Sequence, residues 1–408
     1  MTQMLLKFQL LWGRSRNLLW LGMMGLTCLI ALMAYSLWFS PQITLGLIAP
    51  LSGDFAVFAG KDMVTGAELA VEQANQANQG RGFLVGDRYY RVKLAIADDQ
   101  NKPQSAIQAA DQLFGNYAFG WLVPKPIALI SSPQSSLILP LATHLQSRLQ
   151  SRNLPLITGA TDTGIPPQAK QVISIGLDHS SQGATLATFA RQTLKVQRAA
   201  ILYNPDNYYS QNLVTAFQNT LEKLGGKVVI MATYRGDTTQ DWGSKFPAIV
   251  QAKPDVLLLP NYLPDLISQG KELKKLAQPL NLKFPILGGD SWAGLISANL
   301  PLMEGGFFLS PWHPLLPDRR NQEFIKDYTR AYRQPPRTNA ALTYDAVQMI
   351  LKAIADQKVA NSEAVFRGIQ EPFSGVTGVI SSSLGRSGVI NQIKNGEAEF
   401  YQQMPPNP

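Results

Sequence analysis

The chain has 408 residues, of which 45% are hydrophobic and 16% charged, with a formal net charge of +8 and a single cysteine. A chain of this length usually forms two lobes rather than one core, and its composition excludes an intrinsically disordered protein. The lone Cys28 excludes intramolecular disulfides, thiolate metal sites and a CxxC redox pair, and the scattered Lys and Arg residues do not indicate a nucleic-acid partner.

The N-terminus predicts a membrane segment. Residues 18–39 (LLWLGMMGLTCLIALMAYSLWF) carry no charge, and a helix rising about 1.5 Å per residue over that length spans a hydrocarbon core. Lys7, Arg14 and Arg16 precede this segment, so residues 1–17 are expected in the cytoplasm and the body on the extracytoplasmic, periplasmic side. The competing interpretation is a cleaved signal peptide, because a small-x-small pair stands near the end of the segment. We favour an uncleaved anchor in the plasma membrane.

The body alternates between strand and helix patterns. Residues 43–50 (ITLGLIAP) form an apolar run, followed by a Ser/Gly loop and a helical pattern over residues 62–76. Further buried strands are predicted at residues 90–98, 155–159, 199–204, 227–232, 255–260 and 285–289. Short buried strands separated by helices indicate an α/β fold with doubly wound parallel sheets. In such sheets ligands bind at the carboxyl ends of the strands, so the residues after each strand are the candidates for a site.

Ten motifs follow one another through the body. They are IAPLSGDFAVFAGKDMVTGAELAVEQAN, IADDQNKPQSAIQAADQL, PLITGATD, IGLDHSSQGATLATFA, ILYNPDNYYSQNLVTAF, PDVLLLPNYLPDLISQGKEL, PILGGDSW, EGGFFLSPW, LTYDAVQMILKAI and FSGVTGVISSSLGRSGV. In this order they resemble the type I periplasmic binding proteins, and within them the branched-chain amino-acid (Leu/Ile/Val) binding group of ABC importers. The resemblance covers residues 43 to about 396.

The resemblance implies two α/β lobes joined by a three-strand hinge. It assigns residues 43–177 plus 305–375 to the first lobe and residues 178–304 plus 376–408 to the second. The ligand is expected between the lobes, where its contacts with both of them drive hinge closure.

Five predicted ligand contacts belong to the first lobe. Ser135 and Ser136 precede a helix, whose N-terminal N–H groups and hydroxyls can receive an amino acid's carboxylate. An ordinary Ser N-cap is the alternative role for either serine. Thr161 matches the hydroxyl-bearing loop of the family, and Gly159 and Ala160 there offer backbone groups. A plain turn is the alternative for this loop.

Three predicted contacts belong to the second lobe. Asp290 matches the acidic position that pairs with the ligand's ammonium group, and Tyr262 and Tyr209 match aromatic positions that line this lobe. An ammonium group in a closed cleft needs a carboxylate partner, because a buried unpaired charge costs several kcal/mol. The alternative for Asp290 is an N-cap of the next helix. Tyr208 competes with Tyr209 for the same position.

Four further side chains stand near strand ends. Phe58 and Trp292 are expected either as apolar walls of the ligand site or as core residues. Asp98 and Asp99 resemble a carboxylate pair for acid/base work or metal binding, but with Pro103 following they are more typical of a helix entry.

No catalytic group stands out. His144, His179 and His313 are far apart, and no HExxH, GxSxG, GxxxxGK[ST] or GxGxxG motif occurs. We therefore predict a protein that is not an enzyme and binds no cofactor or metal. We expect a substrate-binding protein that captures a small amino-acid-like molecule for an ABC permease. The alternative is a membrane-tethered sensor or regulatory subunit that uses the same cleft without transport.

Overall fold

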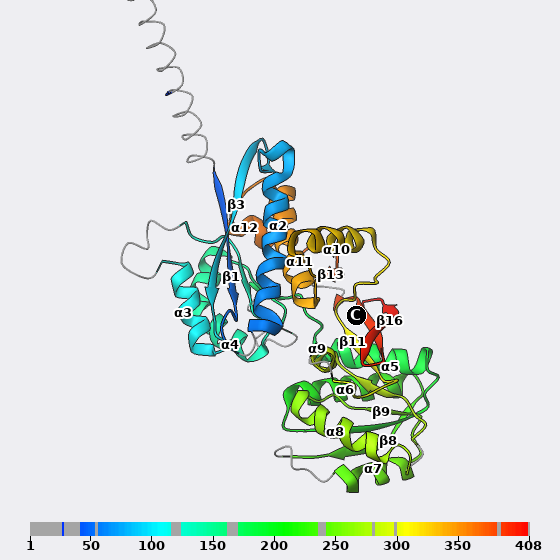
Figure 1. The fold of residues 1–408 in the computed structure, drawn as a ribbon. Helices are drawn as coiled ribbons and strands as arrows, with labels where there is room; N and C mark the ends of the chain where they lie inside the picture. The colour runs from blue at the N-terminus through cyan, green and yellow to red at the C-terminus, as the bar shows by residue number, and fades with distance from the viewer. Residues whose placement is uncertain are drawn as a thin grey trace, which may run out of the picture.

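The structure is a computed structural model that describes residue 27 and residues 41–53, 56–115, 124–160, 170–235, 242–279, 282–297, 300–381 and 385–406. Two lobes, each with its own sheet, lie one above the other in Figure 1. Blue to teal segments and the dark yellow to orange segments of residues 319–368 form the first lobe, and green, bright yellow and red segments form the second.

The first lobe is built on a six-stranded sheet in the order β2-β3-β1-β4-β5-β6. Its strands are β1 (Gln42–Ala49), β2 (Phe83–Val85), β3 (Arg88–Asp98), β4 (Leu129–Ser131), β5 (Leu156–Thr158) and β6 (Val172–Ser174). All neighbours pair in parallel except β2 and β3, which form an antiparallel hairpin. The chain moves outward from β1 first on the β3 side and then on the β4 side, so the strand order reverses at β1. A crevice at the carboxyl ends is expected at such a reversal.

Helices cover both faces of this sheet. They are η1 (Ala56–Gly60), α2 (Lys61–Gly80), α3 (Pro103–Leu113), α4 (Ser135–Arg152), α10 (Arg319–Tyr332), α11 (Thr338–Gln357) and α12 (Ser362–Gly368). One hydrophobic core lies between one face of the sheet, where β1 contributes most, and helices α2 and α11. A second core lies on the opposite face, between β4 and β5 and helices α3 and α4. The sheet is buried on both faces, which explains why β1 is a continuous apolar run rather than an alternating one.

The second lobe repeats the plan with a seven-stranded sheet in the order β16-β15-β11-β10-β9-β7-β8. The strands are β7 (Arg198–Tyr203), β8 (Lys227–Thr233), β9 (Val256–Leu258), β10 (Ile286–Gly288), β11 (Phe307–Ser310), β15 (Gly388–Lys394) and β16 (Glu397–Met404). The helices are α5 (His179–Gln192), α6 (Tyr208–Lys223), α7 (Trp242–Gln251), α8 (Leu263–Leu276), η3 (Asp290–Trp292) and α9 (Ala293–Ser297). Strand order reverses at β7, between β8 and β9. The predicted pair of doubly wound α/β lobes is therefore present.

The strand β11 pairs with β10 and β15, so residues 307–310 lie in the second sheet. The division inferred from the resemblance places the second part of the first lobe from residue 305 onward, a boundary that stays a prediction. In the structure the chain enters the packing of the first lobe again at α10, where Asp327 accepts a hydrogen bond from Gln73 of α2.

Three segments cross between the lobes. The first runs from β6 to α5, the second from β11 to α10, and the third through a small sheet of β12 (Phe373–Gly375), β13 (Gly378–Ser381) and β14 (Gly385–Arg386) into β15. The buried guanidinium of Arg386 donates hydrogen bonds to the carbonyl oxygens of Ile175, Pro311 and Thr377, one in each segment. One side chain therefore ties all three crossings together.

A buried acid supports the third crossing. Asp345 of α11 accepts hydrogen bonds from the backbone N–H groups of Val376 and Thr377, both at 2.8 Å. Burial lowers the pKa of Arg386 to about 10, and the nearby charge of Asp345 opposes this shift. Burial raises the pKa of Asp345, and the hydrogen bonds from Thr377 and Val376 and the charge of Arg386 oppose that shift. The hinge therefore contains a buried acid and a buried base in a network of backbone hydrogen bonds.

Within the described part of the chain, no helix is long and apolar enough to cross a membrane. The predicted anchor at residues 18–39 falls outside that part, except for Thr27.

Candidate functional site

The carboxyl ends of both sheets point toward the boundary between the lobes. In Figure 1 the start of α2, which follows β1 and η1, lies at the end of the first lobe nearest the second, and α9, which follows β10 and η3, lies at the end of the second lobe nearest the first. Close approach makes the first of these connections compact, because a Cβ at Gly60 would lie 1.9 Å from the carbonyl oxygen of Pro50. The residues after the strands are therefore the candidate site.

Three predicted residues of the second lobe come together at these ends. Tyr209 follows β7, Tyr262 follows β9 and Asp290 follows β10. The two tyrosine rings stack with centroids 4.9 Å apart and an interplanar angle of 26°. The phenol oxygen of Tyr209 lies 3.1 Å from the Ser291 hydroxyl, next to Asp290. The three side chains come from different elements, and the parallel sheet brings them to one edge.

The two tyrosines differ in exposure. Tyr209 is buried, whereas 46% of Tyr262 is exposed, so Tyr262 covers Tyr209 and presents the outer aromatic surface of the cluster. Burial and the charge of Asp290 raise the pKa of Tyr209 well above its usual value. Its phenol therefore stays protonated and remains a hydrogen-bond donor. The competing Tyr208 is 59% exposed, and the ring contact with Tyr262 belongs to Tyr209.

The carboxyl group of Asp290 has a raised pKa. Its side chain is half-buried, and burial raises the pKa of its carboxyl group from 3.8 to about 6, although hydrogen bonds from Gln182, the Ser291 backbone and Tyr209 oppose the shift. It is the first residue of η3 and makes no side-chain cap there, since the N-cap position belongs to Gly289. With a pKa of about 6 this carboxylate is charged at neutral pH although burial disfavours its charge. An ammonium ion beside it would therefore be stabilising.

Two functional neighbours were missed by the sequence analysis. Gln182 is fully buried on α5 and its Oε1 accepts a hydrogen bond from the backbone N–H of Asp290 at 3.0 Å. Ser291 donates its hydroxyl to the carbonyl oxygen of Asn261 at 2.8 Å and thereby connects the β10 end to the β9 end. Neither had a signal in the sequence beyond its position beside a strand or on an amphipathic helix.

The first lobe has a hydrogen-bonded edge at the corresponding strand ends. Asp98 accepts hydrogen bonds from the backbone N–H of Leu51 at 2.8 Å and from the Ser52 hydroxyl at 2.5 Å. Asp99 accepts one from the Ser132 hydroxyl. Burial raises the pKa of Asp98, but these hydrogen bonds outweigh it and leave the pKa below its usual value. The two acids therefore fix the loops after β1 and β4, which is a structural role near the helix entry at Pro103.

The predicted contacts near α4 have different exposures. Ser135 and Ser136 are the first two residues of α4, and they are half-buried and exposed respectively. Neither is the N-cap, because that position belongs to Gln134, which makes no side-chain cap. The first turn of α4 therefore carries two hydroxyls beside N–H groups that the N-cap side chain leaves uncapped.

The loop after β5 is partly engaged inside the protein. The N–H of Ala160 donates to the Thr158 hydroxyl at 3.0 Å, and its carbonyl oxygen accepts from the Ser174 hydroxyl at 2.5 Å. Gly159 is half-buried. Thr161 and the side chain of Phe58, two other predicted contacts, lie outside the described part of the structure.

Trp292 is a core residue. It is fully buried and donates its indole N–H to the carbonyl oxygen of Leu259 at 3.0 Å. A Cβ at Gly288 would lie 2.0 Å from its ring, so only glycine allows β10 to pass so close. Trp292 therefore packs against the end of β10 and stabilises the segment that contains Asp290.

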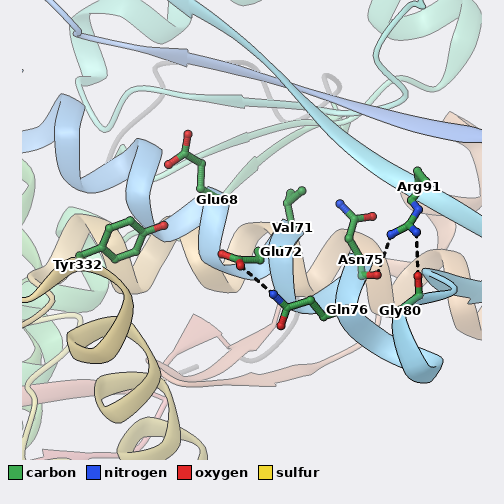
Figure 2. Close-up of a pocket in the computed structure, with 8 residues that line it drawn as sticks. All are labelled: Glu68, Val71, Glu72, Asn75, Gln76, Gly80, Arg91 and Tyr332. Atoms are coloured by element: carbon green, nitrogen blue, oxygen red, sulfur yellow. Dashed lines mark hydrogen bonds between the residues drawn. The ribbon is translucent and has the colours of Figure 1, made fainter. Parts of the chain in front are cut away.

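A hollow among the described residues lies elsewhere, on the first lobe. It has a volume of about 550 Å³ and is lined by α2, by Arg91 of β3 and by Tyr332 of α10 (Figure 2). Arg91 donates to the carbonyl oxygens of Asn75 at 3.0 Å and Gly80 at 2.7 Å, and Gln76 donates to Glu72 at 2.7 Å. These polar groups satisfy one another and clamp the end of α2 to β3, so we assign this hollow a structural role.

Within the described residues, no group of three or more His, Cys, Asp or Glu side chains is placed to hold a metal ion. The polar groups at the candidate site are one carboxylate, which accepts hydrogen bonds, and two phenols, hydroxyls and amides, which can donate them. This set suits hydrogen bonding and charge pairing with a small polar molecule.

Comparisons with known proteins agree with this architecture. Residues 42–392 match the family model of periplasmic binding proteins. A Leu/Ile/Val-binding protein of Rhizobium johnstonii is 29% identical over 277 residues, which are 65% of this chain and 67% of that protein. The matched segment thus spans about two thirds of the length of this relative.

Two solved structures show the same fold at lower identity. The branched-chain amino acid transporter substrate-binding protein of Streptococcus pneumoniae, in complex with isoleucine, superposes with a TM-score of 0.68 at 20% identity over 90% of this chain and 100% of that one. An ABC transporter solute-binding protein of R. palustris, in complex with benzoate, gives a TM-score of 0.63 at 18% identity over 90% and 97%. Because the family model matches residues 42–392, which are most of the chain, and the structure has two lobes with three crossings, this chain belongs to the periplasmic binding protein family.

Proposed function

We propose that the protein captures a small amino-acid-like zwitterion between its two lobes and delivers it to an ABC importer. The single observation that carries this proposal is the carboxylate of Asp290, held at the strand ends of the second lobe beside Tyr209 and Tyr262 with its pKa raised to about 6. The relatives named above as Leu/Ile/Val-binding or bound to isoleucine support an amino acid as the ligand class.

The ammonium group is the part of the ligand that this site favours. Closure of the lobes would remove water from Asp290, and a carboxylate desolvated without a partner costs several kcal/mol. An ammonium group offsets that cost through a charge-assisted hydrogen bond. An aromatic acid such as the benzoate bound by the R. palustris protein carries no cation, so it would meet the acid unpaired. The charge of Asp290 therefore favours amino acids over simple carboxylic acids.

The other half of the zwitterion is assigned to the first lobe. The start of α4, with Ser135 and Ser136, offers hydroxyls and backbone N–H groups to a carboxylate, and the positive end of the helix dipole favours an anion there. Gly159, Ala160 and Thr161 complete this side of the proposed site. Both backbone groups of Ala160 are engaged within the protein, its N–H with Thr158 and its carbonyl oxygen with Ser174, so the hydroxyl and N–H groups at the start of α4 are the main donors proposed for the carboxylate.

The location follows from the N-terminal sequence. We infer that residues 18–39 anchor the protein in the plasma membrane, that the body faces the extracytoplasmic side, and that the partner is an ABC permease. Release of ligand to the permease requires only reopening of the hinge, so no catalytic step is assigned to this protein. Copurification of a permease and an ATPase with the full-length protein from membranes supports transport, whereas copurification of a kinase or cyclase favours a sensor.

Equilibrium titration of the full-length protein with the amino acids, their amides and urea tests the proposal. We expect saturable binding with a Kd in the micromolar range or tighter, and its loss in Asp290→Ala. Tyr208→Ala is the matched control, because this exposed neighbour lies outside the aromatic cluster. The proposal fails when none of these compounds binds the wild-type protein, or when Asp290→Ala binds as tightly as wild type.

A further inference from the structure

Gln182 is a buried amide whose two ends are both used. Its Oε1 accepts the backbone N–H of Asp290 at 3.0 Å, and its Nε2 donates to the carbonyl oxygen of Leu177 at 2.9 Å. The side chain is 0% exposed. A backbone donor on one side and a backbone acceptor on the other fix the orientation of the carboxamide, because a flipped amide would face both partners with the wrong group.

The chain beside Gln182 has no room to move toward it. A Cβ at Gly289 would lie 2.0 Å from the phenol oxygen of Tyr209 and 2.7 Å from Oε1 of Gln182. The backbone at residues 289–290 thus rests directly on these two side chains. Their positions set the position of Asp290.

The other partner of Gln182 belongs to the hinge. Leu177 lies in the first crossing segment, between β6 and α5, and Ile175 in the same segment accepts a hydrogen bond from Arg386. Hydrogen bonds therefore run from the three-segment hinge through this crossing and Gln182 to the backbone of Asp290. The acid is tied to the segment that must bend when the lobes close.

We propose that Gln182 is a positioning residue for Asp290, holding the acid's backbone against the first crossing segment so that the carboxylate meets the ligand's ammonium group in one fixed place. This inference rests on the proposed function of the site. It assigns a binding role to a residue that does not itself contact the ligand.

The groups around Asp290 determine how loss of the Gln182 side chain would change the pKa of this acid. Tyr209 from α6 is a titratable group that interacts with this acid. Tyr209 in turn stacks on Tyr262 and contacts His179 of α5 edge-on, with 4.9 Å between ring centroids in each pair. Burial raises the pKa of Asp290, and the Gln182 side chain is foremost among the groups that hold the pKa down. Without that side chain the carboxylate loses stabilisation, so its pKa rises further.

The test uses Gln182→Met, which keeps the length of the side chain and removes both hydrogen bonds. The first readout needs no ligand: a carbon-13 NMR titration of the Asp290 carboxyl group in the full-length protein, assigned with Asp290→Asn. The second is the Kd of L-leucine from pH 5 to 8. Asn391→Leu is the matched control, since Asn391 is also a buried amide of the second lobe and bonds to Ser310 and Val389.

We expect Gln182→Met to move the Asp290 pKa and the midpoint of the leucine pH profile upward by about half a unit or more, and to weaken leucine binding about tenfold at pH 7.5. Asn391→Leu should change neither. The inference is overturned when Gln182→Met leaves the Asp290 pKa at its wild-type value, or when Asn391→Leu shifts it equally. Should Gln182→Met not fold, Gln182→Glu keeps the acceptor oxygen and adds a second acid, and an unchanged Asp290 pKa in that variant also overturns the inference. Absence of leucine binding with a shifted pKa counts against the proposed function alone.

Discussion

Acidification should weaken ligand binding through a single group, Asp290. Burial raises its pKa to about 6 in the ligand-free protein. An amino acid keeps both its ammonium and its carboxylate charge between pH 5 and 7.5, so only the protein titrates in this range. With a pKa of about 6, nearly all Asp290 side chains are charged at pH 7.5 but only about one in ten at pH 5, and the apparent Kd should rise about tenfold.

Isothermal titration calorimetry with L-leucine from pH 5 to 8 measures this change. The wild-type Kd should stay constant above about pH 7 and rise about tenfold per pH unit once the pH falls below about 6. Asp290→Asn should bind more weakly at pH 7.5 and show a flat profile. A flat wild-type profile refutes the reasoning, and so does a slope that persists in Asp290→Asn, since that slope would belong to another group.

Three other perturbations follow from the same structure. Because the folded pKa of Asp290 lies above its ordinary value of 3.8, its charge destabilises the ligand-free protein above pH 6 and does so less as pH falls toward 3.8. Asp290→Asn should therefore raise the free energy of unfolding by about 1–3 kcal/mol at pH 7.5 but by only about 0.5 kcal/mol at pH 4, as urea denaturation would show. Equal effects at both pH values would contradict this. Gly289→Ala puts a Cβ 2.0 Å from the phenol oxygen of Tyr209 and should weaken leucine binding at least about tenfold. Adding Tyr209→Phe removes that oxygen, so the double variant should recover part of the lost affinity. No recovery would show that the clash lies elsewhere. Arg386→Met leaves three carbonyl oxygens of the crossings without their donor and Asp345 without its opposing charge. It should therefore lower the free energy of unfolding by about 3–5 kcal/mol in chemical denaturation, whereas Arg330→Met, at an exposed ion pair, should lower it by less than about 1 kcal/mol. Similar losses in the two variants would contradict the hinge role of Arg386.

Much of the fold was predictable from the sequence because its signals are local. The apolar runs at residues 43–50 and 199–204 are β1 and β7, each shifted by one residue at both ends, and burial on both faces of the sheet explains why these runs are continuous. The α/β class and the two lobes follow from the alternation of such runs with helical patterns. The pairing of β11 in the second sheet is not local, since it depends on β15, about eighty residues further along the chain.

The candidate site, like the fold, was only partly predictable from the sequence. Tyr209, Tyr262 and Asp290 each follow a strand, so the rule for parallel sheets locates them, and stacking of the two rings agrees with that expectation. Gln182 could not be found in this way, because a buried glutamine on an amphipathic helix looks like any polar residue of the helix surface. Arg386 lies in the third crossing, but Ile175, Pro311 and Asp345 are distant from it in sequence, and only the folded hinge brings these partners to it.

Serines before a helix also show where sequence patterns stop being informative. Ser135 and Ser136 were predicted either as ligand contacts or as N-caps, but the helix begins at Ser135 and the cap position falls on Gln134. Helix boundaries vary by one or two residues, and a shift of one residue exchanges an N-cap for a first-turn position. Their role toward a ligand stays a prediction.

The most direct test of the account is a calorimetric comparison of L-leucine with 4-methylpentanoate, which keeps the side chain and carboxylate of leucine but lacks the ammonium group. A site organised around the Asp290 carboxylate should bind L-leucine in the micromolar range or tighter and the deaminated compound at least about a hundredfold more weakly. Asp290→Asn should reduce this difference by weakening leucine alone. Equal affinity for the two compounds in the wild-type protein would contradict the central claim that Asp290 receives the ligand's positive charge.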